Sequence, residues 1–203
     1  MNLTRVAGID VGFSHLACVF ADIDNDTFEI TPVYAHMQDL RNLKCEKPKA
    51  CSFEEKDRKG AHLVHHFIEL LQPWFQKVDQ VIIEAQPITS THKGIEQLLH
   101  ASLKQRFGAR KGSSFVRLIS PRSMHAYFKI SQSKVERRLQ VVEITSNLLH
   151  NLPAFRKAVQ KDHLGDAVAY IMFYAQTILP TIILAKEVNP FTKYALAEED
   201  IFN

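Results

Sequence analysis

The feature that most constrains this chain is an acid between two glycines near the N-terminus, in the sequence Gly8-Ile9-Asp10-Val11-Gly12. Apolar residues precede Asp10, and a second apolar run follows at residues 16–20. This pattern predicts a buried strand that carries one carboxylate. A buried carboxylate is costly to keep ionised unless charged partners or a metal ion compensate it. Asp10 therefore needs partners elsewhere in the chain.

The bulk composition is that of an ordinary globular domain. The chain has 203 residues, of which 46% are hydrophobic and 23% charged, so we expect residues 1–203 to form a single domain. No uninterrupted apolar run reaches the roughly 20 residues that span a bilayer, and we expect no membrane partner. The cysteines do not form a disulfide framework, which favours a soluble protein of a reducing, intracellular compartment. They are Cys18, Cys45 and Cys51.

Positive charge is concentrated in one part of the chain. Residues 97–142 contain ten Lys or Arg and one acid, a formal charge of +9, and the remainder carries −6. Aromatic residues are interleaved with these cations, as is typical of nucleic-acid-binding surfaces. We expect the cations to bind DNA phosphates, with a solvated surface run as the alternative. The candidates are Lys104, Arg106, Arg110, Lys111, Arg117, Arg122, Lys129, Lys134, Arg137 and Arg138.

Hydrophobic periodicity predicts an α/β fold. The predicted strands lie within residues 6–21 (two strands), 28–35, 79–85 and 115–119. The predicted helices cover residues 61–75, 95–107, 133–149 and 162–179, and residues 38–57 are expected to form a loop. Three successive strands suggest an antiparallel meander, and the later β-α-β-α-β order suggests parallel strands joined by crossover helices. We predict a mixed five-stranded sheet with helices on both faces. We expect the apolar face of the helix at 133–149 to pack in the core, with a dimer interface as the alternative; this face contains Val135, Leu139, Val142, Ile144 and Leu148.

Two later segments offer partners for Asp10. Glu84 ends an apolar strand, at the edge where α/β sheets place their sites, although taken alone it could be a surface acid. Asp162, His163 and Asp166 open the last predicted helix, where spacings of three and four residues bring side chains together. Asp162 also fits N-terminal capping. Asp166 fits capping less well, because it lies a turn further in, beside residues expected to be buried.

These acids together predict a metal site. Clustered carboxylates repel one another strongly unless a cation neutralises them, and they are ligands that Mg²⁺ and Mn²⁺ prefer. Two such ions about 4 Å apart serve phosphodiester hydrolysis, one activating water and the other stabilising the leaving oxygen. The combination of carboxylates with a basic segment indicates a nuclease.

Three motifs, in this order, resemble those of the RNase H-like superfamily, specifically the RuvC-like Holliday junction resolvases and above all their poxvirus-type branch. They are Gly8-Ile9-Asp10-Val11-Gly12, Ile82-Ile83-Glu84 and Lys161-Asp162-His163-Leu164-Gly165-Asp166. The resemblance implies an RNase H-like fold with two Mg²⁺ or Mn²⁺ ions per site. It implies catalytic, metal-binding roles for Asp10, Glu84 and Asp166.

The resemblance leaves two site residues open. The family's remaining ligand falls three residues before Asp166, where this chain has His163 in place of an acid. Histidine can ligate Mn²⁺, and Asp162 is the neighbouring alternative. The resemblance also implies a basic residue that assists at the scissile phosphate. Lys134 fits this role, and Arg137 and Arg138 compete with it.

The implied activity is that of a metal-dependent endonuclease, a Holliday junction resolvase that cuts four-way DNA junctions by paired symmetric nicks. The two-fold symmetry of such branched DNA implies a homodimer. The alternatives are another RNase H-like nuclease, acting on RNA:DNA hybrids or resembling a transposase, and a non-catalytic nucleic-acid-binding scaffold. An actin-like ATPase also begins with a Gly-Ile-Asp-x-Gly strand. It needs, however, a second, repeated half of the fold and further glycine-rich phosphate-binding loops, for which 203 residues and seven glycines leave no room. We expect a viral or bacterial origin in preference to a mitochondrial one.

Overall fold

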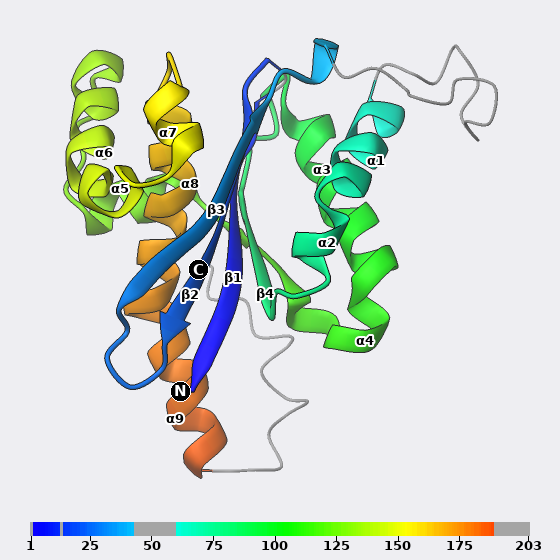
Figure 1. The fold of residues 1–203 in the computed structure, drawn as a ribbon, viewed down its shortest axis with the longest axis vertical. Helices are drawn as coiled ribbons and strands as arrows, with labels where there is room; N and C mark the ends of the chain where they lie inside the picture. The colour runs from blue at the N-terminus through cyan, green and yellow to red at the C-terminus, as the bar shows by residue number, and fades with distance from the viewer. Residues whose placement is uncertain (1, 13, 43–59, 189–203) are drawn as a thin grey trace.

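The computed structural model describes residues 2–12, 14–42 and 60–188. In these ranges a five-stranded sheet has the order β3-β2-β1-β4-β5 (Figure 1). The strands are β1 (Leu3–Asp10), β2 (Leu16–Asp24), β3 (Ile30–Gln38), β4 (Gln80–Glu84) and β5 (Val116–Ile119). β1 pairs antiparallel with β2, and β2 antiparallel with β3. β4 pairs parallel with both β1 and β5. The predicted mixed sheet is confirmed.

Helices cover both faces of the sheet, as predicted (Figure 1). One layer contains α1 (Ala61–Leu70), α2 (Gln72–Phe75), α3 (Lys93–Leu103), a π-helical turn (Lys104–Gly108) and α4 (Ala109–Lys111). The other contains α5 (Pro121–Tyr127), α6 (Lys134–Leu149), α7 (Pro153–Lys157), α8 (Asp162–Phe173), a second π-helical turn (Tyr174–Ile178) and α9 (Leu179–Val188). Short 3₁₀ turns lie at Leu40–Asn42 and Ser113–Phe115. Each layer encloses its own hydrophobic core against the sheet.

The alternation of side chains along β1 decides which layer Asp10 faces. Ala7 and Ile9 pack in the core beneath α1 and α3, and Val6 packs in the core beneath α8. Gly8 and Asp10 therefore face α8, because residues two apart lie on the same side of a strand. A Cβ atom at Gly8 would lie 2.2 Å from the Ala167 carbonyl oxygen. The first glycine of the motif thus permits the close contact between β1 and α8.

A second glycine brings α6 against the start of α8. A Cβ atom on Gly165 would lie 2.9 Å from Val141 Cγ1 and 3.0 Å from Thr145 Oγ1. Val141 and Thr145 are buried, and the Thr145 hydroxyl donates to the Val141 carbonyl of its own helix at 2.7 Å. This contact holds the basic N-terminal half of α6 next to the acidic first turn of α8.

Two short helices that begin at prolines were not predicted, and the predicted end of the last helix was wrong. Pro121 and Pro153 begin the short helices α5 and α7, because proline fits the first helical turn, where its missing N–H needs no partner. At the C-terminal end, helical structure continues past Pro180 to Val188. The π-helical turn just before Pro180 interrupts the regular hydrogen-bond ladder, and the Thr177 hydroxyl bonds to the Phe173 carbonyl at 2.6 Å.

The continuous helix Asp162–Ala185 is long and apolar enough to cross a membrane, and an 18-residue stretch of it has a mean hydropathy of 1.7. The sequence expectation counted only uninterrupted apolar residues and missed this stretch, which Gln176 and Thr177 interrupt. Its α8 portion packs on β1 and β2 as the central helix of a core. A helix in that position has the same all-round apolar composition.

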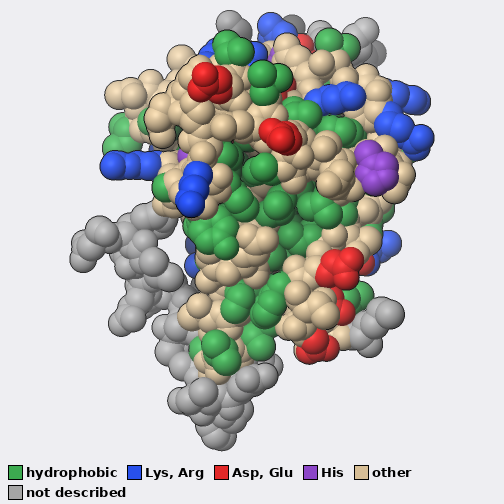
Figure 2. Space-filling model, turned by 90° about the vertical axis from the view of Figure 1, so that its left-hand side faces the viewer, with side chains coloured by type: hydrophobic (Ala, Val, Ile, Leu, Met, Phe, Trp, Pro, Cys, Tyr) green, Lys and Arg blue, Asp and Glu red, His purple; other side chains and the backbone are tan. Residues whose placement is uncertain are grey.

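The apolar face of α6 is only partly in the core. Val141 and Leu149 are buried, whereas Val135 and Leu139 are 70% and 68% exposed. Figure 2 shows hydrophobic side chains gathered on this side of the molecule. The expected burial was therefore wrong for Val135 and Leu139, because the core contact of α6 lies in its second half. The other three expected positions are partly buried: Val142, Ile144 and Leu148.

The loop expected at residues 38–57 is described only in its first part. β3 continues to Gln38, and the short 3₁₀ turn follows. Cys45 and Cys51 lie outside the described residues.

Candidate active site

The ends of two neighbouring parallel strands place Asp10 beside Glu84. Ile9 pairs with Ile83 in the register of β1 and β4, so the next residues of both strands lie together. Ile82 packs in the core beneath α8, and Glu84, two residues further on, faces the same side. Glu84 Oε2 also accepts the Val11 N–H at 3.3 Å. The register of the sheet thus pairs these two carboxyl groups under the start of α8.

The first turn of α8 supplies the remaining predicted side chains. His163 Nδ1 lies 2.7 Å from Asp10 Oδ2. The charge of Asp166 raises the pKa of Asp10, and the charge of Glu84 raises the pKa of Asp166. Asp162 lines the same hollow and pairs with Arg138, with 2.9 Å between Oδ2 and Nε. The structure therefore joins His163, and not Asp162, directly to Asp10.

Burial and mutual repulsion make this cluster hard to ionise. Burial, followed by the charge of Asp166, raises the pKa of Asp10 to about 8. Burial and the neighbouring Glu84 raise the pKa of Asp166 to about 7. The pKa of Glu84 is well above its usual value because of burial and Asp10. Burial lowers the pKa of His163, so its imidazole favours the neutral form. Without a cation, the carboxyl groups cannot all be charged at neutral pH.

Basic side chains of α6 line the site together with the acids. Lys134, Arg137 and Arg138 line the same hollow as the acids, which has a volume of about 260 Å³. Arg137 is near enough to lower the pKa of both Asp10 and Asp166, although burial outweighs it. The hollow therefore combines buried oxygen ligands at its floor with cations at its rim.

The donor set fits divalent metal ions. Asp10, Glu84 and Asp166 offer hard oxygen ligands whose negative charges the neighbouring cations only partly neutralise, and His163 offers a neutral imidazole. Among the described residues, no three His, Cys, Asp or Glu side chains already surround one metal position. His163 and Asp10 already lie at the same point of the hollow, with 2.7 Å between Nδ1 and Oδ2.

Other residues complete the site, and three of them, Gln86, His92 and Tyr170, were missed in the sequence. Gln86 and His92 line it from the segment between β4 and α3. The His15 ring, after the β1 turn, stacks on His163 with 5.0 Å between ring centroids. The buried Tyr170 hydroxyl interacts with Glu84. Tyr170 has a sequence signal, since it follows Asp166 by one helical turn; Gln86 and His92 have none, because their place depends on how the segment folds back.

The predicted DNA-binding residues separate into groups. Lys134, Arg137 and Arg138 lie at the acidic hollow, and Arg122 lines an adjoining one. A separate hollow of about 510 Å³ is lined by Arg106, Arg110 and Lys111. Lys104 lies on the π-helical turn that also contains Arg106. Lys111 Nζ bonds the Val78 carbonyl, just before β4 and so at the opposite end of that strand from Glu84. Arg117 lies half-buried in the middle of β5, and Lys129 is exposed after α5.

A mixed sheet of this order, with acids at the ends of β1 and β4 and on a helix across them, defines the RNase H-like fold. No family model and no curated protein matches the sequence. Among solved structures, the chain is similar to the fowlpox virus resolvase in complex with Holliday junction DNA, with a TM-score of 0.60 and 15% identity over 87% of this chain and 99% of that one.

Two further resolvases share the fold. The yeast mitochondrial Holliday junction resolvase Ydc2 has a TM-score of 0.60 and 18% identity, covering 91% of this chain and 84% of that one. Thermus thermophilus RuvC in complex with a Holliday junction substrate has a TM-score of 0.53 and 18% identity, covering 87% and 98%. The chain thus has the RNase H-like fold of Holliday junction resolvases over most of its length.

Proposed function

We propose that this chain is a metal-dependent endonuclease that resolves four-way DNA junctions. The observation that carries the proposal is the convergence of Asp10, Glu84 and Asp166 in one hollow whose rim is basic. Acids alone could bind a metal for many purposes. Cations at the rim favour a substrate that is itself an anion, and a phosphodiester is the anion that this arrangement suits.

Asp10, Glu84 and Asp166 would hold the metal ions, with His163 as the further ligand. Bound Mg²⁺ or Mn²⁺ would supply an activated water nucleophile and stabilise the leaving oxygen. His163 would take this role in preference to Asp162, because Asp162 is already neutralised by Arg138 at 2.9 Å. The hydrogen bond between His163 and Asp10 supports this assignment, since it holds the two side chains at the same point.

The basic side chains of α6 would bind and orient the DNA strand. Lys134 and Arg137 line the same hollow as the acids, where they can donate hydrogen bonds to the phosphate oxygens and offset the negative charge that develops during hydrolysis. Arg137 is partly buried, and Lys134 is exposed. Lys134 can therefore follow the reacting phosphate, whereas Arg137 provides a fixed cation.

The symmetry of the substrate supports a homodimer. A four-way junction has approximate two-fold symmetry, and a C₂ dimer would present two identical acidic hollows to strands of the same polarity. Light scattering of the protein with and without junction DNA measures this directly. A protein that stays monomeric when bound to the junction would make paired cuts independent events and would refute the dimer.

The experiment that tests the function compares substrates. The protein is incubated with Mg²⁺ or Mn²⁺ and a four-way junction, a linear duplex of the same sequence or an RNA:DNA hybrid. We expect cleavage of the junction alone, with none in EDTA. Preferential cleavage of the hybrid would identify another RNase H-like nuclease. Junction binding without cleavage in either metal would favour a non-catalytic scaffold.

A further inference from the structure

We propose that Gln86, Arg122, His125 and Arg137 form a binding site for a second DNA phosphate, the one next to the phosphate that is cut. This inference rests on the proposed function and adds a substrate contact to it. The site lies outside the acidic cluster and includes side chains that no charge count along the sequence could select.

Two adjoining hollows define the path of the strand. The acidic hollow continues into a second one of about 660 Å³ between the end of β4 and the start of α5. Gln86 and Arg137 line both hollows, so a chain that leaves the acids passes between them. Arg122 and His125 line the second hollow but not the first, and none of the described residues that line the second hollow is acidic. An anion is therefore favoured there without any metal ion.

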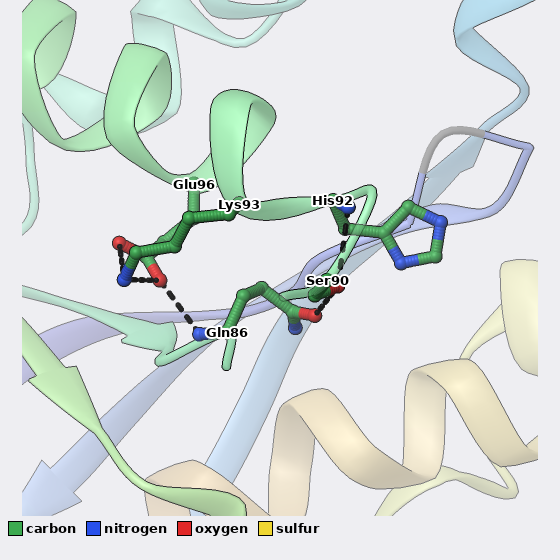
Figure 3. Close-up of polar contacts among 5 residues, drawn as sticks. All are labelled: Gln86, Ser90, His92, Lys93 and Glu96. Carbon is green, nitrogen blue, oxygen red and sulfur yellow. Dashed lines mark hydrogen bonds and ion pairs between the residues drawn. The ribbon is translucent and has the colours of Figure 1, made fainter. Parts of the chain in front are cut away.

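A buried ion pair fixes the segment that carries Gln86. Glu96 of α3 is only 1% exposed, and its Oε2 accepts the Gln86 backbone N–H at 2.6 Å. Lys93 Nζ neutralises this carboxylate, at 3.0 Å from Oε1 and 2.8 Å from Oε2. Figure 3 shows the arrangement, with the His92 ring directed away from the ion pair. A neutralised, fully engaged buried carboxylate of this kind is a rigid anchor for a backbone amide.

A second contact orients the Gln86 side chain. Gln86 Oε1 accepts the Ser90 hydroxyl at 3.0 Å, and Ser90 Oγ in turn accepts the His92 N–H at 3.1 Å (Figure 3). Because the amide oxygen is engaged, the amide nitrogen is left as the free donor. Within residues 2–12, 14–42 and 60–188 that nitrogen has no hydrogen-bond partner. A pre-oriented donor between two hollows suits a phosphate oxygen.

Replacing single DNA phosphates by neutral methylphosphonates locates the proposed second phosphate contact. The Asp10→Asn chain, which should bind without cutting, is titrated with four-way junctions that carry one methylphosphonate at successive positions around the cut. We expect the substitution next to the cut phosphate to weaken binding about 10-fold, because one charge-assisted hydrogen-bonded contact is lost. Adding Gln86→Ala and Arg122→Ala should reduce that penalty to about 2-fold or less, since the contact is already absent.

Two further variants keep the test decisive. Gln86→Glu preserves shape and the bond from Ser90 but places a negative charge beside the phosphate, so it should bind the junction more weakly than Gln86→Ala. Gln97→Ala changes an exposed glutamine of α3 and should leave the methylphosphonate profile unchanged. A penalty next to the cut that persists in the Gln86→Ala, Arg122→Ala chain would overturn this inference and leave the proposed nuclease intact. Failure of the Asp10→Asn chain to bind any junction would overturn both.

Discussion

His163 Nδ1 on the first turn of α8 lies 2.7 Å from Asp10 Oδ2 at the end of β1. This contact joins residues that are 153 positions apart in the chain. Gly8 permits this contact because it lets α8 approach the strand, and Gly165 lets α6 pack beside the same turn of α8. The packing of glycines against helices is thus what assembles the candidate active site.

The third ligand can be identified by substitution. His163→Ala should lower metal-dependent cleavage by about 100-fold, because loss of a metal ligand should cost at least as much as loss of a residue that only orients one, typically about 10–100-fold. Asp162→Asn should lower it by less than about 10-fold, because the Asp162 carboxylate is occupied by Arg138. Single-turnover rates on a junction at saturating protein measure both. The opposite order of rates would make Asp162 the ligand and His163 a partner of Asp10 only.

Gly8→Ala should destabilise the fold. The new Cβ atom would lie 2.2 Å from the Ala167 carbonyl oxygen and 2.8 Å from Ile171 Cγ1, so backbone must move, at a cost of about 1–3 kcal/mol. Gly94→Ala in α3 is the matched control, because nothing lies within 4 Å of its Cβ position. It should be neutral or stabilise the helix by up to about 1 kcal/mol. Urea unfolding measures both, and equal effects would contradict the close contact.

The stability of the metal-free protein should fall as the pH rises. The pKa of Asp10 is raised to about 8 and that of Asp166 to about 7, whereas in the unfolded chain both lie near about 4. Between about pH 4 and pH 8 the folded state holds protons that the unfolded state has released, so the free energy of unfolding decreases as the pH rises. Below about pH 4 the full stabilisation is present, and above about pH 8 it is lost.

Denaturation in EDTA at several pH values, for the native chain and for Asp10→Asn, isolates this contribution. The native chain should lose more stability than Asp10→Asn between pH 5 and 8, and Mg²⁺ or Mn²⁺ should restore it at pH 8 by binding the ionised site. Parallel pH profiles for the two proteins, with no effect of either ion, would show that the acids are not coupled as the structure places them.

The two basic groups should differ in what they control. Arg137→Ala should lower both junction affinity and the cleavage rate at saturating DNA, because Arg137 faces the acids. Arg110→Ala, at the opposite end of β4, can alter affinity but should leave that saturating rate unchanged. Each lost phosphate contact should reduce the slope of log affinity against log salt by about 1. A reduced saturating rate in Arg110→Ala would place the reacting phosphate elsewhere.

The sheet and its acids could be predicted because they depend on local pattern. Short apolar runs bounded by turn residues identified the strands, and Asp10 and Glu84 both end apolar strands that pair in parallel. The acidic start of α8 was visible because buried helices are apolar on all sides after their first turn. These features need no knowledge of contacts between distant segments beyond the order of the strands.

The rest depends on contacts between distant segments. The +9 segment looked continuous, but α3 and α4 carry its first cations to the far end of β4 before β5 returns to the site. A count along the chain ignores such reversals. Gln86 could not be selected either, because its position is fixed by a buried carboxylate ten residues later. The sequence predicted the strand at residues 115–119 but no helix directly after it, although Ser120 caps and Pro121 begins α5.

The most direct test of the central claim is nick mapping on a four-way junction with the native chain and Asp10→Asn at equal bound fraction. We predict paired, symmetric nicks by the native chain in Mg²⁺ or Mn²⁺, and undiminished binding with no nicks by Asp10→Asn. Metal-dependent nicking that survives in Asp10→Asn would contradict the assignment of this cluster as the active site.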